Sequence, residues 1–186
     1  MSKATEKVVA SHLTDHLEDN NLLEILKSAY KKGHRQLLRE LTMIYLERLT
    51  TMLVSLLSVL LDLSAAFDTD DHQILLTRLK CRYGIKRNAL AWLRSYLSNR
   101  FQYVRVVNDC SSKHKLACGV PQGSVLGPIL YSMYTAPIAD VIKRHGMGFN
   151  FYADDTQIYM SFNPADALQS KSLIERCIQR CPTMDG

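Results

Sequence analysis

The fold of this chain is decided by Gly148-Phe149-Asn150-Phe151-Tyr152-Ala153-Asp154-Asp155-Thr156-Gln157-Ile158-Tyr159-Met160-Ser161-Phe162. Strand-forming residues flank an adjacent pair of aspartates, which predicts a β-hairpin with Asp154 and Asp155 at or near its turn. Two carboxylates held this close repel each other unless a cation offsets their charge. A hard divalent ion that takes oxygen ligands, Mg²⁺ above all, is the natural partner. The alternative is that both aspartates are ordinary turn residues at a solvated hairpin tip.

A third aspartate follows a second apolar segment. Leu53–Leu61 is apolar nearly throughout, which is typical of a fully buried strand or a buried helix, and Asp62 comes directly after it. A carboxylate at the end of a buried strand is costly without a metal ion or a cationic partner. The alternative is that Asp62 caps the helix expected to begin around Asp70 or Asp71.

A loop rich in glycine and proline lies between the two acidic sites, Gly119-Val120-Pro121-Gln122-Gly123-Ser124-Val125-Leu126-Gly127-Pro128. Glycines let a backbone approach a ligand closely, and prolines make a turn rigid. A long apolar helix is expected over Ile129–Ile142, so the loop would lie at a buried helix N-terminus, where phosphate binding is favoured. The spacing differs from that of a P-loop.

The remaining elements follow from periodicity and turn residues. Helices are expected over Thr5–Leu17, Asp71–Tyr83, Arg87–Leu97 and Pro164–Gln179. In the first of these helices, the expected buried face carries Val8, Val9, Leu13 and Leu17. Phe101–Val107 and Lys115–Val120 are expected to be strands, joined by a loop over Asn108–Ser112.

Composition limits the kind of protein and its partners. The net charge is +5 and the pI is near 9.0, which favours a polyanionic partner. Five cysteines without paired metal-ligand spacing indicate buried thiols in a reducing compartment. The polar start predicts no signal peptide, and Leu49–Leu61 is shorter than the roughly 20 residues of a membrane-spanning helix. We therefore expect an intracellular chain, nuclear or cytoplasmic, with no membrane partner.

Two polar features have both an ordinary and a functional interpretation. Lys31, Lys32 and Arg35 surround a glycine, which is typical of a solvated basic turn or of a phosphate contact. His12 and His16 are one helical turn apart, a spacing that binds zinc when other ligands converge, but surface histidines are the simpler interpretation.

The two aspartate motifs and the Gly119–Pro128 loop, in this order and spacing, resemble the reverse transcriptases of non-LTR, LINE-like retrotransposons. The resemblance covers about Ser2–His34 and nearly all of Val59–Phe162. It implies an α+β fold, a polymerase palm with an antiparallel sheet backed by helices, plus partial fingers. Residues 1–58 would be the fingers region and residues 59–186 the palm, truncated before the thumb.

The resemblance also implies a chemistry. Asp62, Asp154 and Asp155 correspond to the catalytic carboxylates that hold two Mg²⁺ ions, with Mn²⁺ as a substitute. The expected reaction is RNA-templated DNA synthesis, in which the 3′-hydroxyl of a DNA primer attacks the α-phosphate of a dNTP. Phe67 corresponds to the aromatic residue that rejects a ribose 2′-hydroxyl by steric clash. The other expected substrate-binding residues are Gln122, Gly123, Tyr152, Lys31, Lys32 and Arg35.

The sequence departs from the family over Gln36–Ser58, a leucine-rich stretch that does not align. Our hypothesis is a compensated pair of frameshifts in this stretch, which the other two reading frames of the coding DNA would test. The alternative function is a catalytically silent retroelement remnant with at most nucleic-acid binding. A palm-like nucleotide cyclase or a phosphodiesterase would fit the acidic pair but not the Gly119–Pro128 loop. The sequence assigns no oligomeric state.

Overall fold

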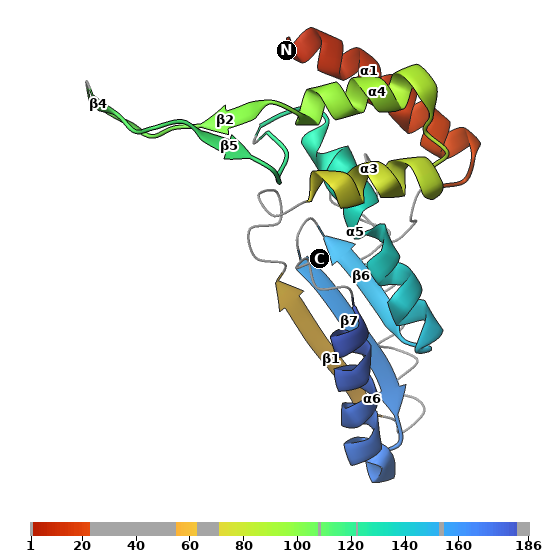
Figure 1. The fold of residues 1–186 in the computed structure, drawn as a ribbon. Coiled ribbons are helices and arrows are strands. Elements are labelled where there is room, and N and C mark those ends of the chain that lie inside the picture. Colours follow the sequence, from red (N-terminus) through yellow and green to blue (C-terminus); the bar gives the residue numbers. More distant parts are fainter. Residues whose placement is uncertain are drawn as a thin grey trace. The chain divides into compact units, whose positions relative to one another are not determined.

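The computed structural model describes residues 2–22, 55–62, 71–107, 109–121, 123–152 and 155–181, and for Asp62, Tyr152 and Asp155 it describes the backbone alone. The helices are α1 (Lys3–Asp19), α3 (His72–Cys81), α4 (Arg87–Leu97), α5 (Gly127–Arg144), the short 3₁₀ helix η1 (Pro164–Asp166) and α6 (Ala167–Arg180). The strands are β1 (Ser55–Asp62), β2 (Arg100–Gln102), β3 (Arg105–Val106), β4 (Asp109–Cys110), β5 (His114–Leu116), β6 (Gly148–Tyr152) and β7 (Asp155–Phe162). The mixture of helices with antiparallel sheets confirms the predicted α+β class (Figure 1).

The described elements divide into two compact units. Unit one contains α1, α3, α4, β2–β5 and the first part of α5, up to Tyr134. Unit two contains β1, the rest of α5 from Thr135, β6, β7, η1 and α6. Each unit is described by itself. The division into fingers and palm stays a prediction.

Unit one begins with α1, whose buried face differs from the predicted one. Glu6, Ala10, Leu13 and Leu17 are buried, whereas Val8 is 57% exposed. The reason is the helical period, because steps of four and three residues place these four side chains in one stripe and leave Val8 outside it. The stripe therefore carries a carboxylate at its N-terminal end.

Asp71, the residue just before α3, caps the N-terminus of this helix. Asp71 accepts hydrogen bonds from the backbone N–H groups of Gln73 (2.7 Å) and Ile74 (2.9 Å). The alternative interpretation made Asp62 the cap of this helix, but Asp71 supplies the cap. At the other end, Gly84 has φ +67°, and Ile85 N–H donates to the Leu79 carbonyl (3.0 Å). The helix ends at Cys81, two residues before the predicted end at Tyr83, and Gly84 turns the chain that follows.

A side chain satisfies a carbonyl in the middle of α5. Pro137 lies inside this helix and has no N–H to donate to the carbonyl of Met133, four residues earlier. The hydroxyl of Tyr83, which is buried, donates to that carbonyl instead (3.2 Å). Arg78 donates to the next carbonyl, that of Tyr134. The segment that follows α3 therefore helps to hold the first part of α5.

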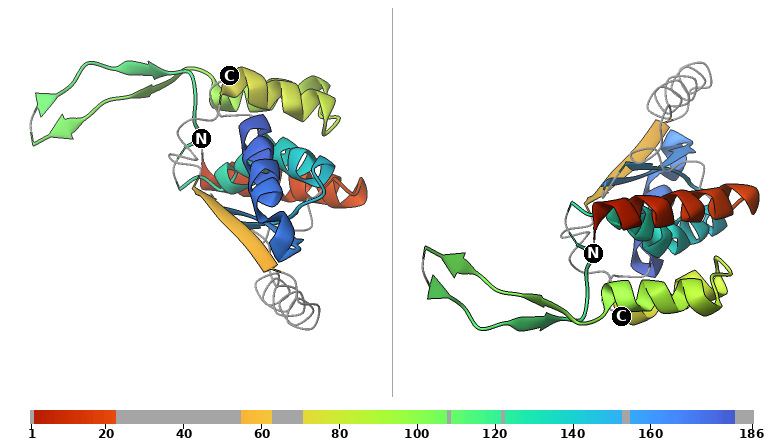
Figure 2. Two further views of the ribbon diagram at one scale, coloured as in Figure 1. Left: turned by 90° about the horizontal axis from the view of Figure 1, so that it is seen from below. Right: turned by 90° about the horizontal axis from the view of Figure 1, so that it is seen from above.

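An arm of two antiparallel strands extends from unit one, away from α3 and α4 (Figures 1 and 2). We define the arm as residues 100–107 and 109–116; β2 pairs with β5, and β3 pairs with β4. The prediction of one continuous strand over Phe101–Val107 is wrong, because pairing is interrupted at Tyr103–Val104. At this interruption Ser111 makes two hydrogen bonds with the backbone of Val104. Its Oγ accepts from the Val104 N–H and its own N–H donates to the Val104 carbonyl, both at 2.9 Å. β4 also occupies part of the predicted loop.

Unit two is a three-stranded antiparallel sheet in the order β1-β7-β6. Its core lies between this sheet and the helices α5 and α6. The buried residues of this core are Ile138, Ala139, Val141, Ile142, Met147, Phe149, Phe151, Ile158, Ile174 and Cys177. The resemblance implied an antiparallel sheet backed by helices for this part of the chain. The hairpin of β6 and β7 is confirmed, with Tyr152 and Asp155 as its last paired residues.

The prediction that the apolar segment before Asp62 is fully buried is wrong. It forms β1, whose side chains alternate between the two faces of the sheet, so only alternate ones reach the core. Leu57, Val59 and Leu61 pack against the core, whereas Leu60 is 75% exposed. Among the described residues, the helices include none long and apolar enough to span a bilayer.

Candidate active site

Two of the three predicted catalytic aspartates meet at one end of the sheet of unit two. Asp62 is the last residue of β1, Asp155 is the first residue of β7, and the two are register partners in the antiparallel ladder. On its other side, Asp155 is the register partner of Tyr152, the last residue of β6. Asp155 is therefore a residue of the central strand. Asp62, Asp155 and Tyr152 form one row across the three strands.

The remaining predicted residues divide into those inside and those outside the described part of the chain. Gly123 is described and has φ +70°, in the left-handed region that favours glycine. Outside the described residues lie Asp154, Phe67, Gln122, Lys31, Lys32 and Arg35. The roles of all these residues stay predictions.

A carboxylate donor set suits Mg²⁺, which prefers oxygen ligands. Opposed residues in an antiparallel ladder are the closest positions across two strands, with α-carbons about 4.5–5.5 Å apart. The pairing of Asp62 with Asp155 therefore fits a shared cation. Among the side chains that the structure describes, no three His, Cys, Asp or Glu residues gather as metal ligands, and the three predicted aspartates are not in that set.

The Gly119–Pro128 loop belongs to unit one and leads into α5, as predicted. Ser124 organises its end, because its Oγ accepts from the N–H of Gly127 (2.9 Å) and its own N–H donates to the Pro121 carbonyl (3.0 Å). A Cβ added at Gly127 would come within 2.8 Å of that Oγ. Glycine at this position therefore allows the close approach on which the turn depends.

Glu6 reaches this loop from α1. It is only 7% exposed, and its Oε2 accepts from the backbone N–H of Val125 (2.8 Å), just before α5 begins. The Tyr96 hydroxyl, from α4, donates to the same oxygen at the longer distance of 3.5 Å. Burial is the main cause that raises the pKa of Tyr96, and the negative charge of Glu6 also raises it.

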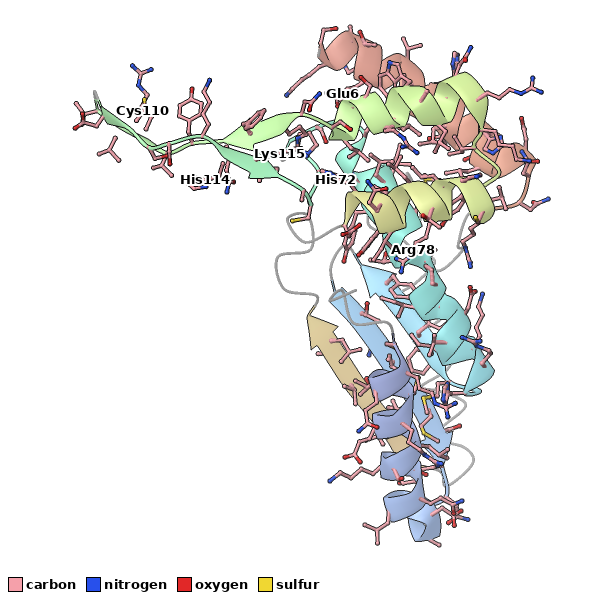
Figure 3. All side chains as sticks on the ribbon, viewed as in Figure 1. Glu6, His72, Arg78, Cys110, His114 and Lys115 are labelled. Carbon is pink, nitrogen blue, oxygen red and sulfur yellow. The ribbon has the colours of Figure 1, made fainter. Side chains whose placement is uncertain are left out.

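The other end of the loop is held at the carbonyl of Gly119. His72 Nε2 and Arg100 Nη1 both donate to this oxygen, each at 2.7 Å. His72 is the first residue of α3 and Arg100 is the first residue of the arm; Glu6 and His72 both lie near the base of the arm (Figure 3). Side chains from α1, α3 and β2 thus hold the two ends of the loop.

These holding residues could not be identified as such from the sequence. Glu6 lies in a polar segment and looks like a surface residue, although its spacing from Ala10, Leu13 and Leu17 already places it on the buried stripe. That spacing is the one available clue. His72 and Arg100 act on a residue far away in sequence, and no local pattern predicts such a contact.

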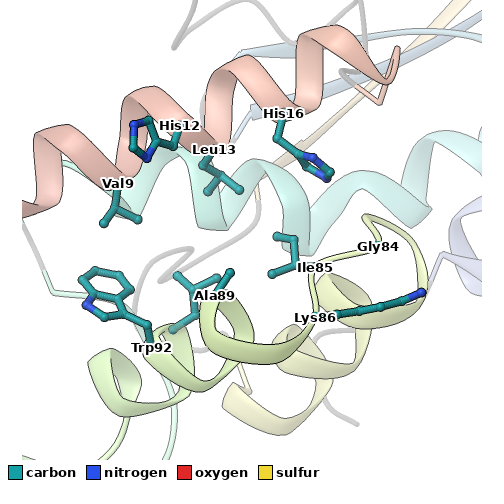
Figure 4. Close-up of a pocket in the computed structure, with 10 residues that line it drawn as sticks. Val9, His12, Leu13, His16, Gly84, Ile85, Lys86, Ala89 and Trp92 are labelled. Atoms are coloured by element: carbon teal, nitrogen blue, oxygen red, sulfur yellow. The ribbon is translucent and has the colours of Figure 1, made fainter.

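A groove of about 390 Å³ lies between α1 and α4, lined by Leu13, Ile85, Trp92 and other residues (Figure 4). His12 and His16 lie on its wall. His16 Nε2 makes a hydrogen bond with the carbonyl of Tyr83 (2.8 Å), so this ring joins α1 to the chain after α3. This contact gives His16, which is half-buried, a structural role, whereas His12 is exposed.

The sequence matches the profile of the family described as reverse transcriptase (RNA-dependent DNA polymerase) over residues 1–182. Because the match covers nearly the whole chain, the chain belongs to the reverse transcriptase family. Its relatives, described next, confirm the narrower prediction of a non-LTR retrotransposon origin.

The chain is 32% identical over 175 residues to the probable RNA-directed DNA polymerase from transposon BS of Drosophila melanogaster, which is 88% of this chain and 18% of that protein. It is 30% identical over 164 residues to the probable RNA-directed DNA polymerase from transposon X-element of the same organism, or 83% of this chain and 17% of that protein. It is also 36% identical over 104 residues to the RNA-directed DNA polymerase from mobile element jockey, again of Drosophila melanogaster. This match covers 53% of this chain and 11% of that protein. The chain therefore spans less than a fifth of the length of these relatives.

Proposed function

We propose that this chain carries the catalytic carboxylates for RNA-templated DNA synthesis by two-metal nucleotidyl transfer, as part of retrotransposition. The observation that carries the proposal is the pairing of Asp62 with Asp155 at the end of the sheet of unit two, in a chain of the reverse transcriptase family. The two residues are far apart in sequence and come from the two separate motifs that predicted the site. Asp154, which precedes Asp155, completes the proposed set of ligands.

In this proposal Asp62, Asp154 and Asp155 hold two Mg²⁺ ions, and Mn²⁺ can replace them. The bound ions would supply the positive charge that favours ionisation of the primer 3′-hydroxyl and offsets the charge on the leaving pyrophosphate. The three carboxylates would hold the ions through oxygen ligands. They require no proton transfer of their own, because they act as ionised ligands.

The finer assignments belong to the same proposal. Residues 59–186 form the palm and residues 1–58 the partial fingers. Phe67 excludes the ribose 2′-hydroxyl, and Gln122 and Gly123 line the dNTP and the RNA template. The further substrate-binding positions are Tyr152, Lys31, Lys32 and Arg35. The hydrogen bonds that Glu6 accepts from Val125 and that His72 donates to Gly119 hold the two ends of this loop, which supports its use as such a surface.

The alternative function is a silent remnant that at most binds nucleic acid. The net charge of +5 fits this alternative, because contacts with the phosphate backbone supply most nucleic-acid affinity. Under this alternative, the aspartate row is an inherited arrangement without turnover.

Primer extension on an RNA template separates the two functions. The 186-residue chain is incubated with a DNA primer annealed to RNA, dNTPs and Mg²⁺, beside the Asp154→Asn variant. The proposal predicts extension that requires Mg²⁺ and is lost in the variant. Equal background in both proteins contradicts the proposed enzyme and leaves the silent remnant. Asp166→Asn, an exposed aspartate of η1, is the matched control and should extend like the unmodified chain.

A further inference from the structure

The arm of unit one has no assigned role, and its composition is unusual for a solvent-exposed ribbon. Residues 100–116 contain Arg100, Arg105, Lys113 and Lys115 against the single carboxylate of Asp109. The arm thus contributes +3 to the chain's net charge of +5. An isolated two-stranded ribbon is only marginally stable in water, so a partner that covers it would add to its stability.

Aromatic rings lie exposed among these charges. Phe101 is 55% exposed and Tyr103 is 54% exposed, although rings of this size are usually covered in a folded domain. Phe101 of β2 is the register partner of Lys115 of β5. Register partners in an antiparallel ribbon share a face, so a ring and an exposed ammonium group lie side by side on the arm, where Figure 3 labels Lys115.

The base of the arm is joined to the Gly119–Pro128 loop. Arg100, the first residue of β2, donates to the Gly119 carbonyl (2.7 Å). Cys118, just after β5, forms an isolated antiparallel β-bridge with Asp71, just before α3. The arm is therefore fixed at its base to the loop proposed to line the template, while its outer part is exposed.

We propose that the arm binds single-stranded RNA, with bases stacked on Phe101 and Tyr103 and with phosphates near Lys113, Lys115 and Arg105. Exposed rings interleaved with cations are the arrangement that proteins use to hold single strands without sequence preference. Duplex RNA hides its bases inside the stack, so the rings favour an unpaired strand. This inference rests on the proposed function in one respect: the strand would be the part of the RNA template that is not paired with the primer.

The first test measures the contribution of charge. The chain is titrated onto an unstructured, fluorescently labelled RNA at several salt concentrations, without Mg²⁺ or dNTPs, so that binding is measured apart from catalysis. The double variant Lys113→Gln, Lys115→Gln should bind more weakly and reduce the slope of log affinity against log salt by about 0.7 per lost phosphate contact. Both side chains are exposed, so the fold should be unaffected.

The matched control uses a second cationic surface of the same chain. Arg176 and Arg180 of α6, with Arg144 at the end of α5 and His145 just after it, line a pocket of about 560 Å³ in unit two. The double variant Arg176→Gln, Arg180→Gln removes the same charge as the arm variant and should leave both the affinity and the salt slope near those of the unmodified chain. If the two double variants lose affinity equally, binding follows net charge alone and the arm proposal is overturned.

The second test measures the contribution of the rings. Phe101→Leu with Tyr103→Leu keeps apolar side chains on the arm but removes the stacking surfaces. The affinity for the unstructured RNA should fall by about tenfold or more, with the salt slope unchanged, because stacking is uncharged. An unchanged affinity would overturn the proposal. It would also be overturned if these variants kept RNA affinity and instead changed the sedimentation of the protein, since the rings would then serve an interface between copies of this chain.

Failure of the arm proposal and failure of the proposed function give different results. Asp154→Asn should abolish primer extension and leave RNA affinity intact, whereas the arm variants should lower RNA affinity. Loss of extension in a chain that still binds RNA through the arm contradicts only the enzyme.

Discussion

Asp62 and Asp155 are register partners, the pair that ends the ladder between β1 and β7. Asp62 is the last residue of an edge strand, and Asp155 is the first residue of the central strand. Two residues that are more than ninety positions apart in the sequence therefore lie on neighbouring strands. Carboxylates carried by register partners would repel each other when ionised. The proposed cation offsets that repulsion.

Loss of the Glu6 carboxylate should loosen the loop that leads into α5. Glu6→Ala leaves the Val125 N–H without its acceptor, and a hydrogen bond to a charged group contributes about 1.5–3 kcal/mol. We expect a loss of this size in the free energy of unfolding, measured in urea, with faster hydrogen exchange at the Val125 amide. Glu6→Gln should lose less, because its amide oxygen can still accept.

Glu18→Ala is the control for Glu6. It removes a carboxylate from the same helix at an exposed position, where substitutions usually change stability by less than about 0.5 kcal/mol. Equal losses in Glu6→Ala and Glu18→Ala would contradict the role given to the contact with Val125.

The hydroxyl of Tyr83 should matter because of Pro137. Tyr83→Phe leaves the Met133 carbonyl with neither a helical donor nor a hydroxyl, and an unsatisfied buried acceptor costs about 1–3 kcal/mol. Thermal unfolding followed by circular dichroism should show the loss. Restoring the backbone donor in the double variant Tyr83→Phe, Pro137→Ala should recover part of it; no recovery would contradict this account.

Gly148 allows the ring of its register partner, Tyr159, to lie across it. A Cβ added at Gly148 would overlap that ring, and such overpacking typically costs about 1–3 kcal/mol. Gly148→Ala should therefore destabilise the chain, and the same substitution made in a Tyr159→Ala background should cost much less. A double-mutant cycle in urea measures this coupling, and strict additivity would argue against the contact.

Cys177 of α6 and Cys181, the C-cap residue of this helix, should be unreactive. Burial raises the pKa of the Cys177 thiol, and burial together with the neighbouring Cys177 raises the pKa of Cys181 to about 12. A raised pKa keeps a thiol protonated, and the thiolate is the nucleophile. Brief alkylation at about pH 8, read by mass spectrometry, should label the exposed Cys81 and Cys110 first. Labelling of Cys181 as fast as Cys110 would contradict this order.

Local patterns in the sequence were sufficient for most elements. Alternation around Asp154–Asp155 predicted the β6–β7 hairpin, and the predicted Arg87–Leu97 helix has the bounds of α4. Such patterns report the face that an element buries, so they identify helices and hairpins but not their neighbours. The family was identified in the same way, because its motifs are contiguous.

What the sequence did not predict depends on contacts between distant segments. β1 seemed fully buried because its composition is apolar on both faces, but its side chains alternate between the core face and the opposite face, where Leu60 is exposed. Glu6 seemed exposed because its neighbours are polar, and only the loop before α5 gives its carboxylate a partner. The break at Tyr103–Val104 depends on Ser111, across the arm.

The most direct test of the central claim is Mn²⁺ binding, followed by electron paramagnetic resonance in the presence of a dNTP. The claim is that Asp62 and Asp155 share a divalent cation, so Asp62→Asn and Asp155→Asn should each weaken Mn²⁺ binding, whereas the control Asp166→Asn should bind like the unmodified chain. The readout needs no turnover, so it does not depend on whether the chain extends a primer. Equal Mn²⁺ affinity in all four proteins would contradict the claim.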